Sequence, residues 1–201
     1  MSSYGKMTEK ERRILKSSHD FITHIWPHVG SFMGGGIIKL VEGNNDNNYN
    51  KNLDTLAGID MWQILPENKG MRSIASRVQY KNDKWTIKYP PNTFTIRYEL
   101  ASGLDTEIDK RIYAIRNEDQ GIAYPAFTIH SYLSYNGPPL FSAAWIKTKD
   151  LFEASEKYRN VWIILPVEGG NKMQVLHWTK LECLGYKVTR WEPIMQMNLP
   201  L

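Results

Sequence analysis

The sequence predicts a mixed α/β fold, in which a mixed central sheet is flanked by helices. Apolar residues recur at helical spacing near the N-terminus and again after residue 105, which indicates a helix in both places. Between residues 58 and 135, several short segments instead alternate apolar and polar residues, as strands do. A continuous apolar run at 161–167 is typical of a buried strand. Because both kinds of segment are interspersed along the chain, an all-helical bundle is excluded.

The composition is that of an ordinary globular protein, with 42% hydrophobic and 23% charged residues among 201. The net charge of +4 favours an anionic partner only mildly. Cys183 is the single cysteine, which excludes an internal disulfide and a cysteine-based zinc cage and suits a reducing compartment. No apolar run approaches the roughly 18 residues that cross a bilayer. The first residues also lack the apolar core of a secretory signal, so we expect a cytoplasmic protein with no membrane partner.

The N-terminal part is predicted to be a helix over residues 7–25, whose apolar residues lie near helical spacing. Pro27 lacks a backbone donor and is expected to end this helix. Three glycines at 34–36 precede the segment 37–42, which fits either a second helix or a strand. The asparagine-rich segment 43–52 has no apolar periodicity and is expected to be a loop.

The middle of the chain is predicted to hold a β-hairpin and further strands. Four segments bounded by turn residues fit strands: 58–65, 71–80, 85–89 and 93–100. The first two are joined by the reverse turn PENKG and form the hairpin. Thr106 is expected to cap a helix that carries isoleucines on one face, and 126–135 is the next strand.

The last third of the chain is predicted to add four elements: a short helix at 151–159, the buried strand at 161–167, a helix at 173–184 and a strand at 187–191. No linker is strong enough to divide the chain. We therefore expect a single domain over residues 1–201, with a core at 7–135 and a C-terminal β-α-β extension at 136–201.

The hairpin carries the most informative polar residues. Asp60 stands where the apolar run of the first arm begins. On the second arm, Arg77 and Gln79 share one face, while Ser76 points to the other, because alternate residues of a strand share a face. An acid on one arm and a cation on the other is an arrangement by which one large nuclease class holds a metal ion and a phosphate.

The order helix, β-hairpin, strand, helix, strand over residues 7–135 resembles the core of the PD-(D/E)XK, or restriction-endonuclease-like, superfamily, in a divergent form of the kind carried by phage and archaeal mobile elements. In that superfamily an acid at the start of the second core strand is followed by acid-x-Lys on the third. Asp60 resembles the first acid, and Ala75-Ser76-Arg77 falls where acid-x-Lys is expected. Ala75 departs from this pattern, because it has no oxygen to offer a metal ion.

Two further residues complete the resemblance. Glu42 resembles a helical glutamate that helps to bind metal in several members, and Gln79 resembles the glutamine that replaces the second acid in some branches. The resemblance implies a metal-dependent nuclease, a viral or mobile-element hydrolase of DNA phosphodiester bonds. Its magnesium or manganese ion would be held by Asp60 and Glu42, with Asp54 in reserve. Arg77 would neutralise charge that builds up on the phosphate.

Basic residues interleaved with aromatic residues are the expected DNA contacts of such a protein. They are Lys84, Lys88 and Arg97 on the strands and Lys110 and Arg111 on the following helix. The expected partner is DNA, and association with a second copy of the chain as a homodimer stays open.

Several alternatives also stay open. Asp60 could simply begin the hairpin as a turn acid, and Ala75 could mark a lost active site in a non-catalytic nucleic-acid-binding module. The sheet could also be the scaffold of a protein-interaction factor. A rival metal site would use Asp20, His24 and His28, which are spaced four apart, but the proline between the two histidines disfavours one continuous helical face.

Overall fold

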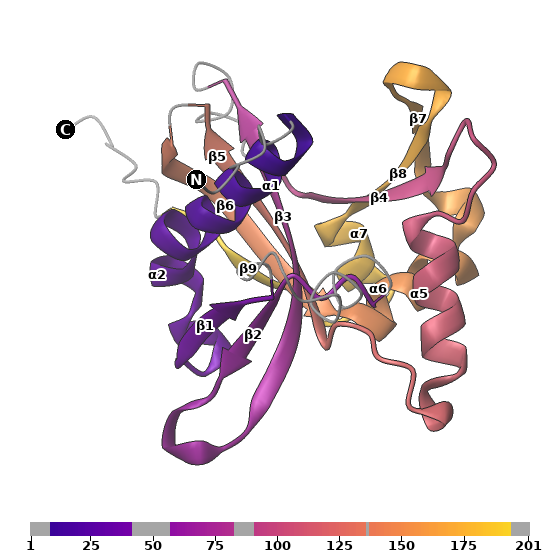
Figure 1. The fold of residues 1–201 in the computed structure, drawn as a ribbon. Coiled ribbons are helices and arrows are strands. Elements are labelled where there is room, and N and C mark those ends of the chain that lie inside the picture. The colour runs from indigo at the N-terminus through magenta and orange to yellow at the C-terminus, as the bar shows by residue number, and fades with distance from the viewer. Residues whose placement is uncertain (1–8, 42–56, 83–90, 136, 194–201) are drawn as a thin grey trace, which may run out of the picture.

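The computed structural model describes residues 9–41, 57–82, 91–135 and 137–193, and its strands form two sheets (Figure 1). The mixed central sheet has the order β1 (Ile37–Leu40), β2 (Met61–Ile64), β3 (Met71–Lys81), β5 (Phe127–Ser134), β6 (Gly137–Lys147), β9 (Thr189–Trp191). The second sheet has the order β4 (Thr93–Glu99), β8 (Lys172–His177), β7 (Ile163–Pro166). The predicted α/β fold class, with helices around a mixed central sheet, is confirmed.

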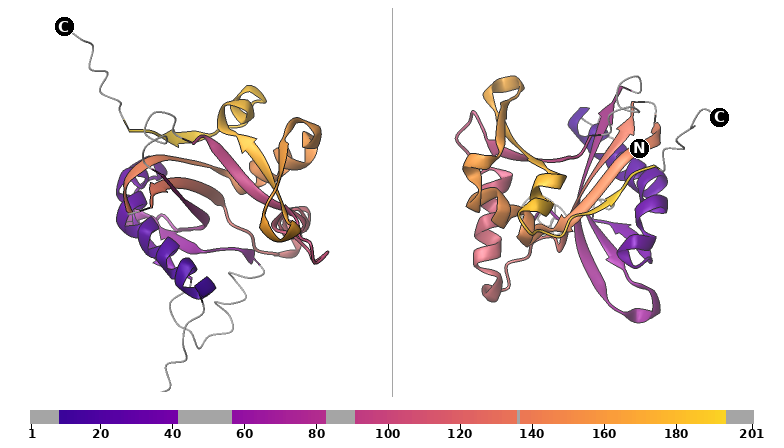
Figure 2. Two further views of the ribbon diagram at one scale, coloured as in Figure 1. Left: turned by 90° about the horizontal axis from the view of Figure 1, so that it is seen from above. Right: turned by 180° about the vertical axis from the view of Figure 1, so that it is seen from behind.

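Helices pack on both sides of the central sheet, as the views from above and behind show (Figure 2). On one side lie α1 (Glu9–Asp20), a π-helical turn (Phe21–Ile25) and α2 (Trp26–Val29). The π-helical turn and α2 share an apolar core with β2, β3, β5 and β6. On the other side lie α5 (Glu107–Arg116), α6 (Thr148–Lys157) and α7 (Trp178–Cys183), packed with the second sheet around a core that includes Phe94, Tyr132 and Trp178. The central sheet therefore separates two hydrophobic cores.

Within the described residues, the N-terminal two thirds follow the predicted order of elements, while the loop expected at 43–52 and the strand expected at 85–89 lie outside the described part of the chain. β1, β2 and β3 form an antiparallel meander, α5 lies on the connection, and β5 returns parallel to β3. The hairpin predicted at 58–65 and 71–80 is confirmed by the pairing of Met61 with Ile74. The segment 37–42, for which a helix stayed open, begins with strand β1. β4 leaves this sheet and pairs with β8 instead.

The expectation that Pro27 ends the first helix was wrong. The helical path continues to Val29 because the turn at Phe21–Ile25 is π-helical, which lets the backbone amide of Trp26 bond to the carbonyl of Phe21. This wider turn places Pro27 in the first turn of α2, where a missing backbone donor costs nothing.

Two predictions for the C-terminal third were also wrong. The apolar run at 161–167 holds the short strand β7, which is an edge strand and leaves Ile163 51% and Leu165 47% exposed. The expected helix at 173–184 is instead strand β8 followed by α7. β8 is paired on both sides and carries apolar residues on both faces, so its spacing imitates a helical pattern.

The described part of the C-terminal segment, residues 137–193, is interleaved with the core. β6 and β9 complete the central sheet, and β8 lies against β4 of the second sheet. Strand β6 escaped prediction because Pro138 and Pro139 argue against a strand. Both prolines lie near its start, outside the pairing of Ala143–Trp145 with β9.

A buried polar contact fastens α1 to β3. Asp20, at the end of α1, is 6% exposed and accepts hydrogen bonds from the ammonium of Lys16 at 2.6 Å and the hydroxyl of Tyr80 at 2.7 Å. Burial raises the pKa of Asp20, but these two hydrogen bonds and the charge of Lys16 outweigh it, so the pKa lies below its ordinary value of 3.8. Burial, together with the neighbouring carboxylate, raises the pKa of Tyr80. The fold thus favours a charged Asp20 beside a neutral Tyr80.

Replacing Asp20 with Ala is expected to lower the free energy of unfolding by about 1–3 kcal/mol at neutral pH, since it leaves two donors without their acceptor. The pKa of Asp20 is lower in the folded state than in the unfolded state, so this contribution is present at neutral pH and is lost as the pH falls below 3.8. Urea denaturation of the wild type and Asp20→Ala, at neutral pH and at a pH below 3.8, measures the effect. An equal difference at both pH values, or one no larger than that of the exposed control Asp119→Ala, contradicts it.

Candidate active site

Asp60 lies immediately before β2, next to Met61, which pairs with Ile74 of β3. The backbone amide of Asp60 also donates to the carbonyl of Ile74, at 3.0 Å, so the regular β2–β3 register ends at Met61. The Oδ2 atom of Asp60 accepts a hydrogen bond from the backbone amide of Ser76 at 2.5 Å. Because the pairing of β2 with β3 runs only from Met71 to Ile74, this carboxylate satisfies the next β3 amide on that side. Asp60 therefore has a structural role beside any catalytic one.

Two predicted residues of β3 face β4. Arg77 donates from Nη1 to the carbonyl of Thr95 at 2.6 Å and from Nη2 to Oε2 of Glu107 at 2.8 Å. Gln79 donates from Nε2 to Oγ1 of Thr95 at 2.7 Å. Glu107 is the first residue of α5 and also lies 3.4 Å from the backbone amide of Arg97. The charge of Arg77 is thus balanced by Glu107, and its guanidinium is held in one orientation.

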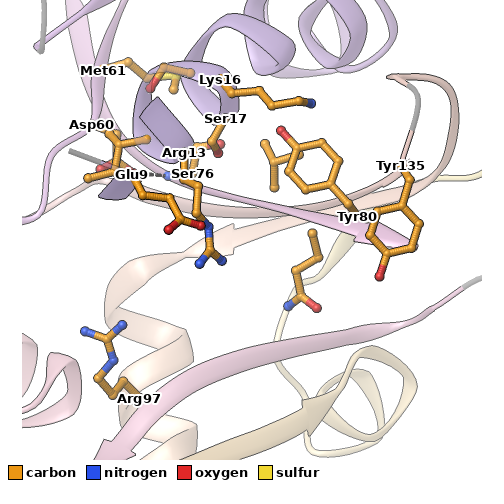
Figure 3. Close-up of a pocket in the computed structure, with 14 residues that line it drawn as sticks. Glu9, Arg13, Lys16, Ser17, Asp60, Met61, Ser76, Tyr80, Arg97 and Tyr135 are labelled. Atoms are coloured by element: carbon orange, nitrogen blue, oxygen red, sulfur yellow. Dashed lines mark hydrogen bonds between the residues drawn. The ribbon is translucent and has the colours of Figure 1, made fainter. Parts of the chain in front are cut away.

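Two cavities meet at Asp60, and together we call them the Asp60 cleft. The first, of about 1120 Å³, is bounded by side chains of α1 and β3 (Figure 3). The second, of about 570 Å³, is bounded by β3, β5 and the start of α5. Asp60, Ser76 and Arg97 line both cavities, so the two cavities adjoin at these residues.

Cations from three elements line the Asp60 cleft. Arg13 of α1 and Arg97 of β4 are exposed, and Lys110 of α5 is half-buried. Among the described residues, no ion pair involves any of these three. Figure 3 shows Arg97 on the opposite wall from Arg13. The cleft therefore offers positive charge to an anionic ligand from both sides.

His130 forms part of the second cavity and is buried. Its Nδ1 atom accepts a hydrogen bond from the backbone amide of Thr95 at 3.2 Å, which requires that nitrogen to be unprotonated. Burial, and then the charge of Arg77, hold the pKa of His130 well below its ordinary value. His130 is therefore a neutral ring that fixes β4 against β5 and does not act as a cation.

The other predicted site residues fall into three groups. Arg97 and Lys110 line the Asp60 cleft. Arg111 also lines the second cavity, but it is 7% exposed and packs closely against Gly58, where a side chain would collide with the guanidinium. The remaining predicted site residues lie outside the described part of the chain: Glu42, Asp54, Lys84 and Lys88.

Sequence reasoning missed Arg13, Glu9 and the function of Glu107. The first two stand on α1, far in sequence from the hairpin, and nothing local marks them as neighbours of Asp60. Glu107 was explained by its place in the first turn of a helix, where an acid meets the positive end of the dipole. The one signal that could have identified Glu107 was the need of Arg77 for a nearby acid to balance its charge.

The donors of the Asp60 cleft fit a hydrated, hard cation. Mg²⁺ is commonly held by one or two carboxylates, with water and substrate phosphate as its other ligands. Asp60 supplies one carboxylate, Glu9 lines the same cavity, and the nearby hydroxyl of Ser76 is buried with no hydrogen-bond partner in the described structure. No group of three or more His, Cys, Asp or Glu side chains among the described residues is arranged to hold a metal ion. The cleft thus fits a cation bound mainly through water, and not one enclosed by protein ligands.

Comparison with known proteins gives no match to a family model, to a curated protein or to a solved structure. In the described residues, no helix is both long enough and apolar enough to span a bilayer. The functional argument therefore depends on the geometry of the Asp60 cleft, because a fold class alone does not determine an activity.

Proposed function

We propose that this chain is a metal-dependent nuclease, of viral or mobile-element type, that binds DNA in the Asp60 cleft and hydrolyses its phosphodiester bonds in the cytoplasm. The observation that supports this most strongly is the set of side chains around Asp60. Asp60 shares the second cavity with the cations Arg97 and Lys110, and no ion pair among the described residues involves either cation. The order of α1, β1, β2, β3, α5 and β5 supports the resemblance to restriction-endonuclease-like proteins as well.

Each residue of the cleft has a distinct part in the proposed reaction. A bound Mg²⁺ or Mn²⁺ would supply Lewis acidity and a water of lowered pKa. Asp60 would hold this cation through its carboxylate, which lines both cavities. Arg97, exposed and shared by both cavities, is better placed than the predicted Arg77 to contact a phosphate. Arg77 would act at a distance, because Thr95 and Glu107 already bind its guanidinium.

A non-catalytic nucleic-acid-binding module is the second candidate. The observation that favours it is Ala75, which lines the second cavity together with Asp60 and has no ligand oxygen. The cationic walls of the cleft serve this function equally well. The two candidates differ in whether the bound strand is cut, and they agree that DNA binds in the cleft.

DNA affinity is expected to fall as salt concentration rises, because cationic side chains release condensed counterions from phosphates. Contacts from Arg13, Arg97 and Lys110 predict a slope of about −2 to −3 in a plot of log affinity against log salt. Arg97→Gln is expected to weaken binding and to reduce the slope by about 1. Fluorescence anisotropy with a labelled oligonucleotide, in EDTA to prevent cleavage, measures both quantities.

The matched control for this titration is Arg116→Gln. Arg116 is exposed on α5, pairs with Glu156 and does not line the cleft. The control should keep the wild-type slope. Absence of DNA binding by the wild type would exclude both candidate functions, and equal slopes for Arg97→Gln and the control would remove Arg97 from the binding site.

A further inference from the structure

The first cavity of the Asp60 cleft extends from Asp60 along β3 towards two tyrosines. Tyr80 lies on β3, and Tyr135 follows the end of β5 at the turn into β6 (Figure 3). The two residues stand together because β3 and β5 are parallel neighbours, with Tyr80 paired to Leu133. The cavity therefore has an acidic end at Asp60 and an aromatic end at the tyrosines.

The two tyrosines differ in how much of each side chain is available to a ligand. The hydroxyl of Tyr80 is bound by Asp20 at 2.7 Å, and the ammonium of Lys16 lies 4.0 Å from the centre of its ring. Tyr80 thus belongs to the floor of the cavity. In the described part of the chain, the backbone amide of Tyr135 donates to the carbonyl of Lys81 at 3.2 Å, and the residue is 65% exposed. Its backbone is thus anchored to the end of β3, and its aromatic ring is accessible.

Cations stand between the aromatic and acidic ends. Arg13 and Lys16 project from α1 on one wall, and Arg97 lies across from them on β4 (Figure 3). A cationic groove that ends in an exposed aromatic ring is the combination by which proteins bind single-stranded nucleic acid. The cations follow the phosphates, and a base stacks on the ring. In a duplex the bases are already stacked on one another, so they offer no free face to Tyr135.

We propose that the first cavity binds a single-stranded segment of DNA, with its backbone between Arg13 and Arg97 and a base stacked on Tyr135. This inference rests on the proposed function and specifies its substrate class. The preferred substrate is DNA that is single-stranded on one side of the phosphate presented to Asp60. Because the two cavities adjoin at Asp60, Ser76 and Arg97, the strand would continue from the first cavity towards the second.

Fluorescence anisotropy with a labelled single strand and with a duplex of the same sequence, both in EDTA, tests this proposal. The wild type should bind the single strand more tightly. Tyr135→Ala should weaken binding of the single strand by about tenfold, in the range expected for loss of one stacked base, and leave duplex binding unchanged. Tyr135→Trp should preserve single-strand binding, because its ring can stack as well.

The matched control is Tyr113→Ala, which removes a tyrosine that is 61% exposed on α5 and does not line either cavity. If Tyr135→Ala behaves as this control does, or if duplex and single strand bind equally, the inference is overturned. Salt-dependent duplex binding with cleavage that requires Asp60 would then leave the proposed function intact. Absence of binding to either DNA would overturn both.

Discussion

Replacing Asp60 with Asn is expected to reduce metal-dependent DNA cleavage by roughly 100-fold or more while preserving the fold. The amide oxygen of Asn can still accept the hydrogen bond from the backbone amide of Ser76. The negative charge that would hold a divalent cation is lost. Gel assays of labelled DNA, with Mg²⁺ or Mn²⁺ in the reaction, measure the cleavage rate, and thermal unfolding measures the stability of the same preparation.

A second variant separates the two roles of Asp60. Asp60→Ala removes the hydrogen-bond acceptor as well as the charge, so it should also lower the free energy of unfolding by about 1–3 kcal/mol. The exposed Asp119→Asn is the control for loss of one acidic charge elsewhere. Wild-type cleavage by a folded Asp60→Asn protein would refute the proposed metal-binding role, and would leave Asp60 as a residue that only completes the β3 hydrogen bonding.

Introducing a carboxylate at position 75 is expected to have the next largest effect. Ala75 lines the second cavity together with Asp60 and is only partly buried, so a glutamate there has room to face the same space. Ala75→Glu should therefore bind Mn²⁺ about tenfold more tightly than the wild type, because affinity for hard cations rises with the number of charged ligands. Its cleavage rate should equal or exceed that of the wild type. Isothermal titration calorimetry measures the affinity.

The same substitution has a predictable cost in the absence of metal. Two neighbouring carboxylates repel each other, which raises the pKa of one of them and lowers the stability of the metal-free protein. Mn²⁺ should restore that stability, because it binds the folded state. The control Ala123→Glu adds a carboxylate at an exposed position away from the cleft. Identical isotherms for wild type and Ala75→Glu would show that position 75 does not face a metal site.

The hairpin could be predicted from sequence because its information is local. A turn between two alternating runs sets the register, which pairs Met61 with Ile74, and Asp60 then lines the second cavity together with Ala75 and Arg77. The helix after Thr106 could be predicted equally well, because its capping box lies within four residues. The Thr106 side chain accepts a hydrogen bond from the Asp109 amide, and the Asp109 carboxylate accepts one from the backbone amide of Thr106. These elements frame the second cavity.

The rest of the site depends on contacts between distant segments. Arg77 meets Glu107 across 30 residues of sequence, and Arg13 reaches the cleft only because α1 packs on β3. Neither contact leaves a periodic signal. The β8 strand was mistaken for a helix for a related reason. It carries apolar residues on both faces, so its sequence lacks the simple alternation of a half-buried strand. Only its pairing with β4 and β7 distinguishes the two structures.

The most direct test of the central claim is to incubate labelled DNA that carries a single-stranded segment with the wild type and Asp60→Asn, prepared in parallel. Cleavage should be followed before and after addition of Mn²⁺ or Mg²⁺. We predict cut fragments only for the wild type and only with the metal ion, with equal DNA binding by both proteins in EDTA at high enough salt to screen the lost charge. Salt-dependent binding without any metal-dependent cleavage by the wild type would contradict the nuclease and leave a nucleic-acid-binding module.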